Sequence, residues 1–335
     1  MKETSVWMLA WRRFKRDRLG VASLVVVVIY AAVMLASATG LIVRDWGDEA
    51  AVNFAPPTFL GPEEESPQLV GLAQDGKPAS DYGIPDPLGP DLAEIAKNLS
   101  GSASGSAAKA LTLPLGADKW GRDVLKKAIK GTQTSLFIGL AAAAVAAFIG
   151  TLFGALAGYR GGSVDDFFNW LYSVFTSIPY LLLVLSIAAV VNSKGVLPVI
   201  LILGLTGWTG IFRLVRAEYM KHKVRDYVMA ADAIGASDTR RMFVHILPNV
   251  SHVVLVQLSL HVVLFIKSEV ILTFLGFGVG VETVSWGSML AEAGTELLLG
   301  KWWQLTVATV FMALLVTAFS LFTDAMRDAL DPRLK

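Results

Sequence analysis

The chain contains no cysteine and has little charge. Cysteine is absent from all 335 residues, which excludes disulfides, cysteine-ligated zinc and thiol catalysis. Charged residues make up only 17% of the chain, against about 25% in a typical soluble domain, whereas 54% of the residues are hydrophobic. The net charge of +1 points neither to nucleic acid nor to an acidic partner. This composition predicts a protein that lies largely in lipid.

Histidine is also scarce, and its positions do not suggest a metal site. The four histidines are too scattered along the chain to predict a shared ligand set, so we expect no metal. They are His222, His245, His252 and His261.

The N-terminal segment lacks the small-residue cleavage site of a signal peptide. Residues 1–20 are basic and precede an apolar run, residues 21–43, that is longer than a signal-peptide core. We therefore expect a retained first transmembrane helix behind a cytoplasmic basic segment.

Long apolar runs recur along the chain. A bilayer core of about 30 Å needs roughly 20 apolar residues of helix. Six stretches meet this length, which predicts an all-α membrane protein with six spans. They are residues 21–43, 133–158, 167–191, 196–217, 251–277 and 303–323.

Basic clusters predict the topology. Arginine and lysine concentrate on the cytoplasmic side of membrane proteins, and residues 12–18 carry five of them. Six spans then return the C-terminal tail, 326–335, to the same side, and segment 218–250 also falls inside with further basic residues. Both termini are therefore expected to be cytoplasmic.

The first outside loop, residues 44–132, is unusually long. It contains Pro-rich and low-complexity sequence, GSASGSAAKA at 101–110, which is typical of a flexible linker, with a short helix predicted at 91–99. GLAQDGKP at 71–78 departs from the phosphate-binding pattern at its last position, where Pro78 cannot ligate magnesium. We expect no ATPase site in this chain, and a five-span core at 133–325.

Three glycines lie four residues apart in the second predicted span. Small residues at this spacing let helix backbones approach closely in lipid. The glycines predict tight helix packing, either within the chain or at a subunit interface. They are Gly150, Gly154 and Gly158.

Polar side chains interrupt the fifth predicted span. Ionisable residues inside a membrane are costly, and they mark either interhelical pairing and snorkelling or a solute path. Gln257 and His261 share one helical face at i, i+4, whereas Lys267 and Glu269 are two residues apart and do not face each other. All four are candidates for lining the translocation pathway.

Residues 226–249, DYVMAADAIGASDTRRMFVHILPN, form a compact, mostly polar segment between apolar runs. Its apolar spacing predicts two short helices. Gly235 can end the first, Ser237 or Asp238 can cap the second, and Pro248 is expected to stop it. Such short helices are marginal alone in water, so the segment must dock on a lipid surface or in a protein cleft.

This segment resembles the EAA loop of ABC-transporter importer permeases, through Ala230-Ala231, Gly235 and Ile246-x-Pro248. Seven segments in order are similar to the C-type permease of dipeptide, oligopeptide and nickel importers, and the resemblance extends over the chain except roughly residues 44–112. They are WRRFKRDRLG (11–20), LPLGADKWGRDVLKKAIKGTQTSLFIGL (113–140), FTSIPYLLLVL (175–185), RDYVMAADAIGAS (225–237), SEVILTFLGFGV (268–279), SWGSMLAEA (285–293) and RDALDPRL (327–334).

The resemblance implies a type I importer permease fold in which the loop at 220–250 forms coupling helices in a cleft of the ATPase subunit. The acidic residue that names the motif is Met229 here, and Asp232 keeps a negative charge nearby. The long first loop is a second departure. The residues expected at the coupling interface are Tyr227, Met229, Ala230, Ala231, Asp232, Gly235, Ala236, Ser237 and Pro248.

The resemblance also implies the function and the partners. We expect a multi-pass transport subunit of a bacterial inner membrane that carries no chemistry of its own and is not an enzyme. Its expected partners are a second, homologous permease in a heterodimer, two ATP-binding subunits that hold ATP and magnesium, and an extracytoplasmic solute-binding protein. An autonomous channel or ion-coupled carrier is the alternative, and which solute is carried stays open.

Overall fold

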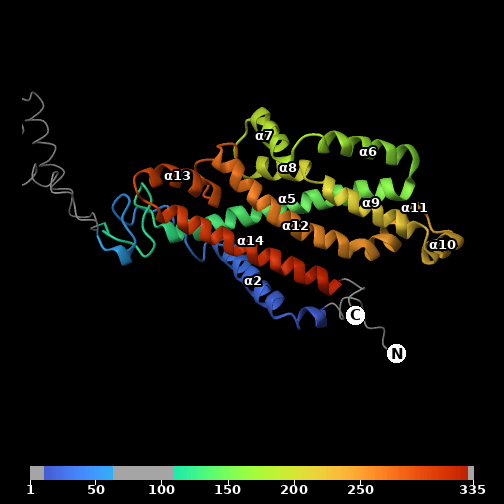
Figure 1. The fold of residues 1–335 in the computed structure, drawn as a ribbon, viewed down its shortest axis with the longest axis horizontal. Coiled ribbons are helices and arrows are strands. Elements are labelled where there is room, and N and C mark those ends of the chain that lie inside the picture. The colour runs from blue at the N-terminus through green and yellow to red at the C-terminus, as the bar shows by residue number, and fades with distance from the viewer. Residues whose placement is uncertain (1–10, 63–108, 331–335) are drawn as a thin grey trace, which may run out of the picture. The chain divides into compact units, whose positions relative to one another are not determined.

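The computed structural model describes residues 11–62 and 109–330, and within these residues it forms helices and isolated bridges but no strand (Figure 1). The all-α class is therefore confirmed for the described part of the chain. The elements are α2 (Arg18–Ala38), η1 (Thr58–Leu60), α5 (Val124–Arg160), α6 (Gly162–Thr176), α7 (Tyr180–Val191), α8 (Val196–Thr206), α9 (Thr209–Lys223), α10 (Asp226–Ala233), α11 (Asp238–Arg240), the π-helical η3 (Arg241–Ile246), α12 (Leu247–Phe274), α13 (Trp286–Leu298) and α14 (Trp303–Leu330).

The chain divides into two compact units. One comprises Asp45–Leu125, and the other comprises Met1–Arg44 with Lys126–Lys335. The smaller unit is held by isolated bridges and by an exposed ion pair, Lys109 Nζ to Glu49 Oε2 at 2.7 Å. The hydrogen bond from Lys109 holds the pKa of the Glu49 carboxyl below its usual value. The predicted helix at 91–99 and segment 71–78 lie outside the described residues.

Membrane-spanning candidates all come from the larger unit, apart from the first residues of α5. Among the described residues, four helices are long and apolar enough to cross a bilayer: Arg18–Ala38, Val124–Arg160, Asp238–Phe274 and Trp303–Leu330. Two bent helix pairs raise the number to six if each pair is counted as one span. The structure thus supports four to six spans.

The predicted span at 167–191 is not one straight helix. α6 and α7 meet at an angle of 85°, with the break at residues 177–179. Pro179 is the cause, because proline disfavours helical geometry in the residue before it and lacks the N–H that a continuing helix would need. The apolar composition was sufficient to predict a span, but it did not show this bend.

The predicted span at 196–217 is also broken. α8 and α9 meet at an angle of 41° around Gly207, and α9 continues to Lys223. A Cβ added to Gly207 would lie 2.4 Å from the ring of Phe265, so only glycine lets α12 approach at this position.

α12 and α14 join several helices of the larger unit. α14 packs against α2, α12 and α13, while α12 also contacts α9 (Figure 1). Tyr30 of α2 donates a hydrogen bond to the Phe311 carbonyl of α14 at 2.9 Å. Phe14, just before α2, is buried against Ala325 and Ala329. This packing leaves α10 and the start of α12 at one end of the helices, away from α13.

Candidate functional site: the 226–248 turn and α12

The turn after α10 is closed by backbone hydrogen bonds. Gly235 has φ +84°, a left-handed conformation that favours glycine. Its N–H donates to the Asp232 carbonyl at 2.8 Å, and the Ala236 N–H donates to the Ala231 carbonyl at 3.0 Å. This pair of bonds is the Schellman arrangement, which ends a helix while satisfying its last carbonyls. The predicted turn at Gly235 is confirmed.

The next helix begins at a capping serine, as predicted. The Ser237 hydroxyl accepts the Arg240 N–H at 3.4 Å, and α11 starts at Asp238.

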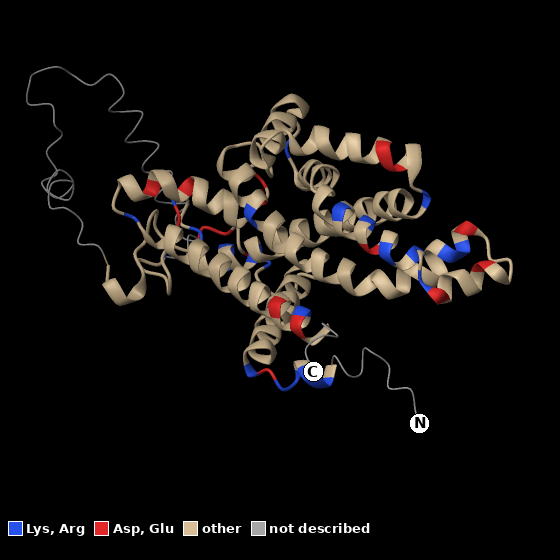
Figure 2. Cartoon of the chain, turned by 45° about the vertical axis from the view of Figure 1, so that its right-hand side comes forward, with Lys and Arg blue, Asp and Glu red and all other residues tan. Residues whose placement is uncertain are grey.

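Arg241 ties the two sides of the turn together. Its guanidinium forms ion pairs with Asp232 of α10 and with Asp238 of α11, the latter at 2.5 Å. It also lies 5.9 Å from the ring centroid of Tyr159, whose hydroxyl donates to Asp238 at 3.1 Å. Asp232 therefore bonds within the turn instead of presenting a lone carboxylate. Figure 2 shows charged residues gathered at this end of the molecule.

α10 has an inward and an outward face. Val228 and Ala231 are buried, at 3% and 5% exposure, in a helix that packs against η3 and α9. Met229 is 53% exposed, Ala230 is exposed, and Ile234 is 86% exposed. Of the two alanines expected at the coupling interface, Ala231 is turned toward its own chain, because the i, i+3 spacing places it beside Val228.

Tyr227 lies at the edge of the outward face. Its hydroxyl is 2.7 Å from Nδ1 of His222, and it is 37% exposed. Partial burial raises the pKa of Tyr227 above its usual value, so the phenol stays neutral at physiological pH.

The prediction that Pro248 stops the second helix is wrong. Residues Arg241–Ile246 form a π-helical turn, in which the Leu247 N–H bonds to the Met242 carbonyl, and the chain continues directly into α12. In a regular α-helix, proline would clash with the carbonyl four residues earlier, whereas the wider turn gives its ring room. The Asn249 side chain donates to the His245 carbonyl at 2.7 Å. Residues Asp238–Phe274 thus form one continuous helical rod, which includes the fifth predicted span.

The three glycines of α5 pack within the chain. A Cβ on Gly150, Gly154 or Gly158 would lie 2.5–2.9 Å from the backbone carbonyls of Trp208, Phe212 or Arg216 respectively. The glycines therefore let α5 pack closely against α9, from its N-cap Trp208 to Arg216. Of the two predicted alternatives, packing within the chain or at a subunit interface, the structure shows packing within the chain.

The four polar residues of the fifth span fall into two groups. His261 is buried, with Nδ1 2.7 Å from the Gln257 carbonyl, whereas the Gln257 side chain is half-buried. Glu269 is fully buried, while Lys267 is exposed. Gln257 and Lys267 therefore lie on the accessible side of α12, whereas His261, one turn from Gln257, is buried.

Glu269 is enclosed by hydroxyl donors. Ser135 of α5 donates to its carboxylate at 2.8 Å, and Thr273 donates at 2.9 Å. Ser135 in turn accepts the Trp286 N–H of α13 at 3.2 Å. The carboxylate thus joins three helices and does not line an open path in this chain.

A pocket of about 390 Å³ opens between α9, α12 and α14. It contains polar groups from all three helices, which include Gln257. Its lining residues are Leu214, Ala217, Glu218, His252, Val253, Val256, Gln257, Arg327 and Leu330.

Comparison with known proteins places these helices in a family. A family model described as the binding-protein-dependent transport system inner membrane component matches residues 150–335, more than half of the chain. The chain belongs to this family. A second model, the N-terminal TM domain of oligopeptide transport permease C, matches residues 5–57. The permease is accordingly a multi-pass protein of the bacterial inner membrane.

Individual relatives agree with the family match. The permease is 36% identical to the dipeptide transport system permease protein DppC of Bacillus subtilis over 67% of its own length and 71% of the relative's. It is 35% identical to the oligopeptide transport system permease protein OppC of the same organism over 66% and 72%. Against DppC of Lactococcus lactis the identity is 30% over 97% of this chain and 90% of the relative.

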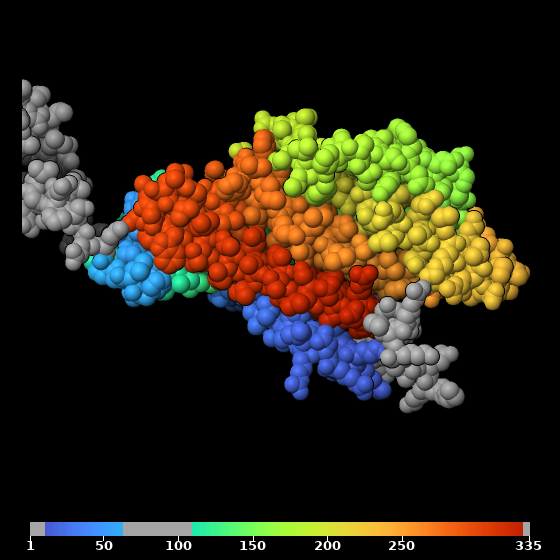
Figure 3. All heavy atoms as spheres, viewed as in Figure 1, coloured from blue at the N-terminus to red at the C-terminus, as the bar shows by residue number. Residues whose placement is uncertain are grey.

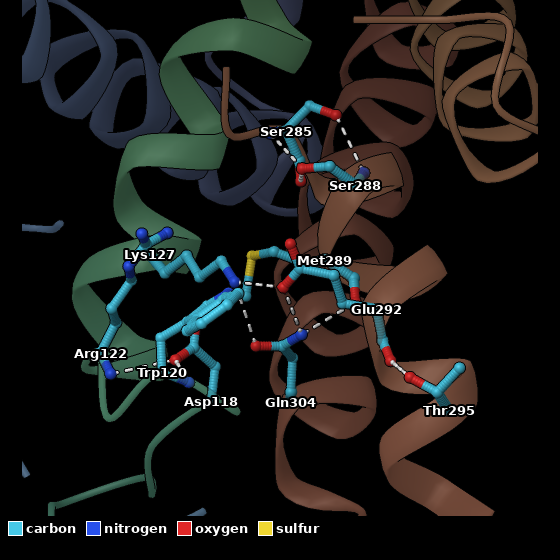
Figure 4. Close-up of polar contacts among 10 residues, drawn as sticks. All are labelled: Asp118, Trp120, Arg122, Lys127, Ser285, Ser288, Met289, Glu292, Thr295 and Gln304. Carbon is cyan, nitrogen blue, oxygen red and sulfur yellow. Dashed lines mark hydrogen bonds and ion pairs between the residues drawn. The ribbon is translucent and has the colours of Figure 1, made fainter. Parts of the chain in front are cut away.

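The permease also holds a partly buried ion pair that no sequence pattern predicted. Lys127 of α5 is buried and pairs with Glu292 of α13, and its Nζ is 3.5 Å from Gln304 Oε1 of α14 (Figure 4). Gln304 Nε2 donates to Glu292 and to the Met289 carbonyl, both at 3.2 Å. No local pattern marks these residues, because Lys127 and Glu292 are 165 positions apart.

Proposed function

We propose that the permease is a transmembrane subunit of an ATP-driven importer of peptides, and that α10 is the surface on which an ATP-binding subunit docks. The observation that carries this proposal is the outward face of α10. Met229, Ala230 and Ile234 are exposed there on a helix too short to span a membrane. Its other face is anchored on η3 and α9, and apolar side chains that gather on an exposed face mark an interaction surface.

The named relatives support the solute class. They are described as dipeptide and oligopeptide transport permeases, and the matched N-terminal model is that of an oligopeptide permease. We infer peptides of a few residues as the solute of this permease as well.

The basic clusters orient the chain. With residues 12–18 and α10–α11 on the cytoplasmic side, α13 lies toward the outside. We propose that a second, homologous permease completes the pathway, that two ATP-binding subunits hold ATP and magnesium at the cytoplasmic face, and that an extracytoplasmic protein delivers the solute.

The geometry suits a lever. The Schellman turn and Arg241 fix α10 to α11, and Tyr219 donates to the Met242 carbonyl at 3.1 Å. The rod then continues through α12, whose 28 residues span about 42 Å. Displacement of α10 by a closing ATPase pair would therefore be carried to the far end of α12. ATP binding would shift the permease between inward-open and outward-open states. This chain supplies the lever and half of the pathway, and it performs no bond-breaking step.

Reconstitution tests the proposal. The tagged permease, expressed with its neighbouring transport genes, should co-purify with an ATP-binding subunit and a second permease. In liposomes the complex should import a radiolabelled tripeptide only when ATP and the solute-binding protein are present. Uptake driven by an ion gradient without ATP would instead support the carrier alternative, and a chain that recovers no ATP-binding subunit would refute the proposal.

A further inference from the structure

One face of α12 is partly exposed along much of its length in the described part of the chain. Leu260, Leu264, Ile271 and Phe274 are 37–52% exposed, and Lys267 between them is also exposed. Their spacing alternates between four and three residues, which keeps them on one side of the helix. Val253 and Gln257 continue the same spacing toward the cytoplasmic end, where they line the pocket. Figure 3 shows α12, in orange, exposed as a band between α14 and α9.

Lys267 is the one charged residue on this face. We call the face the open face of α12, and its residues are Val253, Gln257, Leu260, Leu264, Lys267, Ile271 and Phe274. Within residues 11–62 and 109–330, no carboxylate lies in ion-pair distance of its ammonium. Glu269, two residues away, is turned inward and is satisfied by Ser135 and Thr273. The ammonium therefore needs water or an anion from outside the chain.

Lipid does not suit this position. Lys267 is seven residues before the end of α12 at Phe274, about 10 Å along the axis. Helical side chains lean toward the N-terminal end of their helix, which here points the lysine away from the nearer end. A lysine side chain that points into the bilayer instead of toward its surface has a high free-energy cost. An apolar helix packed on Lys267 would leave the same charge buried without a partner.

The pocket supplies the complementary observation. It lies on the same open face, and Gln257 in its lining is ten positions before Lys267, about 15 Å along the helix axis. Its volume of about 390 Å³ is within the range of small-molecule sites, about 300–1,000 Å³. Glu218 and Arg327 give it both signs of charge. The open face therefore carries both a cavity large enough for a small solute and the Lys267 ammonium.

We propose that the solute moves along the open face of α12 and that the Lys267 ammonium binds its carboxylate. The inference rests on the proposed function, because it takes the solute to be a peptide. A peptide with a free C-terminus carries a carboxylate at neutral pH, and a charge-assisted hydrogen bond to lysine contributes about 1.5–3 kcal/mol, equivalent to tenfold or more in binding. Lys267 is then a specificity-determining residue.

The test compares one tripeptide as its free acid and as its C-terminal amide, chosen so that the wild-type complex imports both. The measured quantity is the ratio of acid to amide uptake in proteoliposomes containing the complete transporter. The preference of the solute-binding protein is the same for every variant, so it cancels when ratios are compared. Lys267→Met removes the charge, Lys267→Arg keeps it, and Lys194→Met is the control at an exposed lysine outside α12.

We expect Lys267→Met to lower the acid-to-amide ratio about tenfold, with amide uptake near wild type. Lys267→Arg should keep the ratio within about twofold, because the charge is retained, and Lys194→Met should leave it unchanged. An unchanged ratio in Lys267→Met, equal loss of acid and amide uptake, or loss of the second permease on purification would each overturn the inference. The last outcome would assign Lys267 to a subunit contact. Absence of ATP-dependent uptake by the wild type would instead refute the proposed function itself.

Discussion

Charged side chains lie near both ends of α12, but their surroundings differ. At the α13 end, Glu269 and Lys127 are buried, and each finds its partners on neighbouring helices of the same chain. At the α10 end, Arg241 forms ion pairs with two carboxylates, and Met229 and Ile234 of α10 are exposed. The charged groups of the first end are satisfied within the chain, whereas the second end holds its charges together and presents apolar side chains outward. This difference supports the docking surface proposed on α10.

The largest effect is expected at the turn. Gly235→Val places a β-branched residue at φ +84°, a conformation that costs such residues about 1–3 kcal/mol, although no neighbour lies within 4 Å of an added Cβ. We expect transport to be abolished while membrane insertion stays normal. Gly235→Asn is the matched control, because asparagine tolerates the left-handed region, and it should retain transport. Near wild-type uptake by Gly235→Val would show that this angle is unimportant for coupling.

The second largest effect is expected where Gly158 of α5 packs against α9. In Gly158→Ala, the new Cβ would meet the Arg216 carbonyl at 2.5 Å, so α5 and α9 must separate. We expect a loss of about 1–3 kcal/mol, measured as a lower thermal midpoint in detergent. Gly294→Ala is the control, since no atom lies within 4 Å there and alanine favours the helix. Equal midpoints for the two variants would mean that the α5–α9 contact is loose.

A smaller effect is expected at the α13 end. Glu269→Gln keeps the shape of the side chain but weakens the hydrogen bonds from Ser135 and Thr273, with an expected cost of about 1 kcal/mol. The thermal midpoint should fall slightly while coupling of ATPase activity to transport is preserved. Glu282→Gln, at an exposed position, should leave the midpoint unchanged. A wild-type midpoint with a selective loss of transport would move Glu269 from a structural role to the pathway.

The smallest effect is expected from Met229→Glu, which restores the residue that names the family motif. Met229 is 53% exposed, so a carboxylate there stays solvated and should not disturb the fold. We expect normal or improved coupling, measured as peptide imported per ATP hydrolysed. A folded but inactive transporter would show that the partner surface has adapted to methionine.

Local signals in the sequence were sufficient for the turn but not for the helix that follows it. Gly235 and Ser237 act through their own backbone and side-chain preferences, so their roles could be predicted from residue type. Pro248 could not, because the π-helical turn that accommodates it depends on residues 241–246 together. The bend at Pro179 was visible in the residues but was overlooked because the flanking runs are uniformly apolar.

Sequence periodicity could not predict contacts between residues that are far apart in the chain. Lys127 and Glu292 meet only because α5 and α13 pack in three dimensions. The charge of Glu269 left interhelical bonding and a solute path open as alternatives, and the structure surrounds its carboxylate with hydroxyl donors from α5 and α12. Ala231 was placed at the partner interface by a motif, and the fold turned it inward. Charge and motif identified the right helices, but packing decided which face each residue occupies.

The most direct test of the docking surface uses the absence of cysteine from the chain. Ala230→Cys and Ala231→Cys place single thiols on adjacent residues of α10, one exposed and one 5% exposed. Maleimide labelling of the permease chain is then measured with and without the ATP-binding subunits. The account predicts that Ala230→Cys reacts in the permease alone and is protected in the assembled complex, while Ala231→Cys reacts in neither. Equal labelling of Ala230→Cys in both states would contradict it.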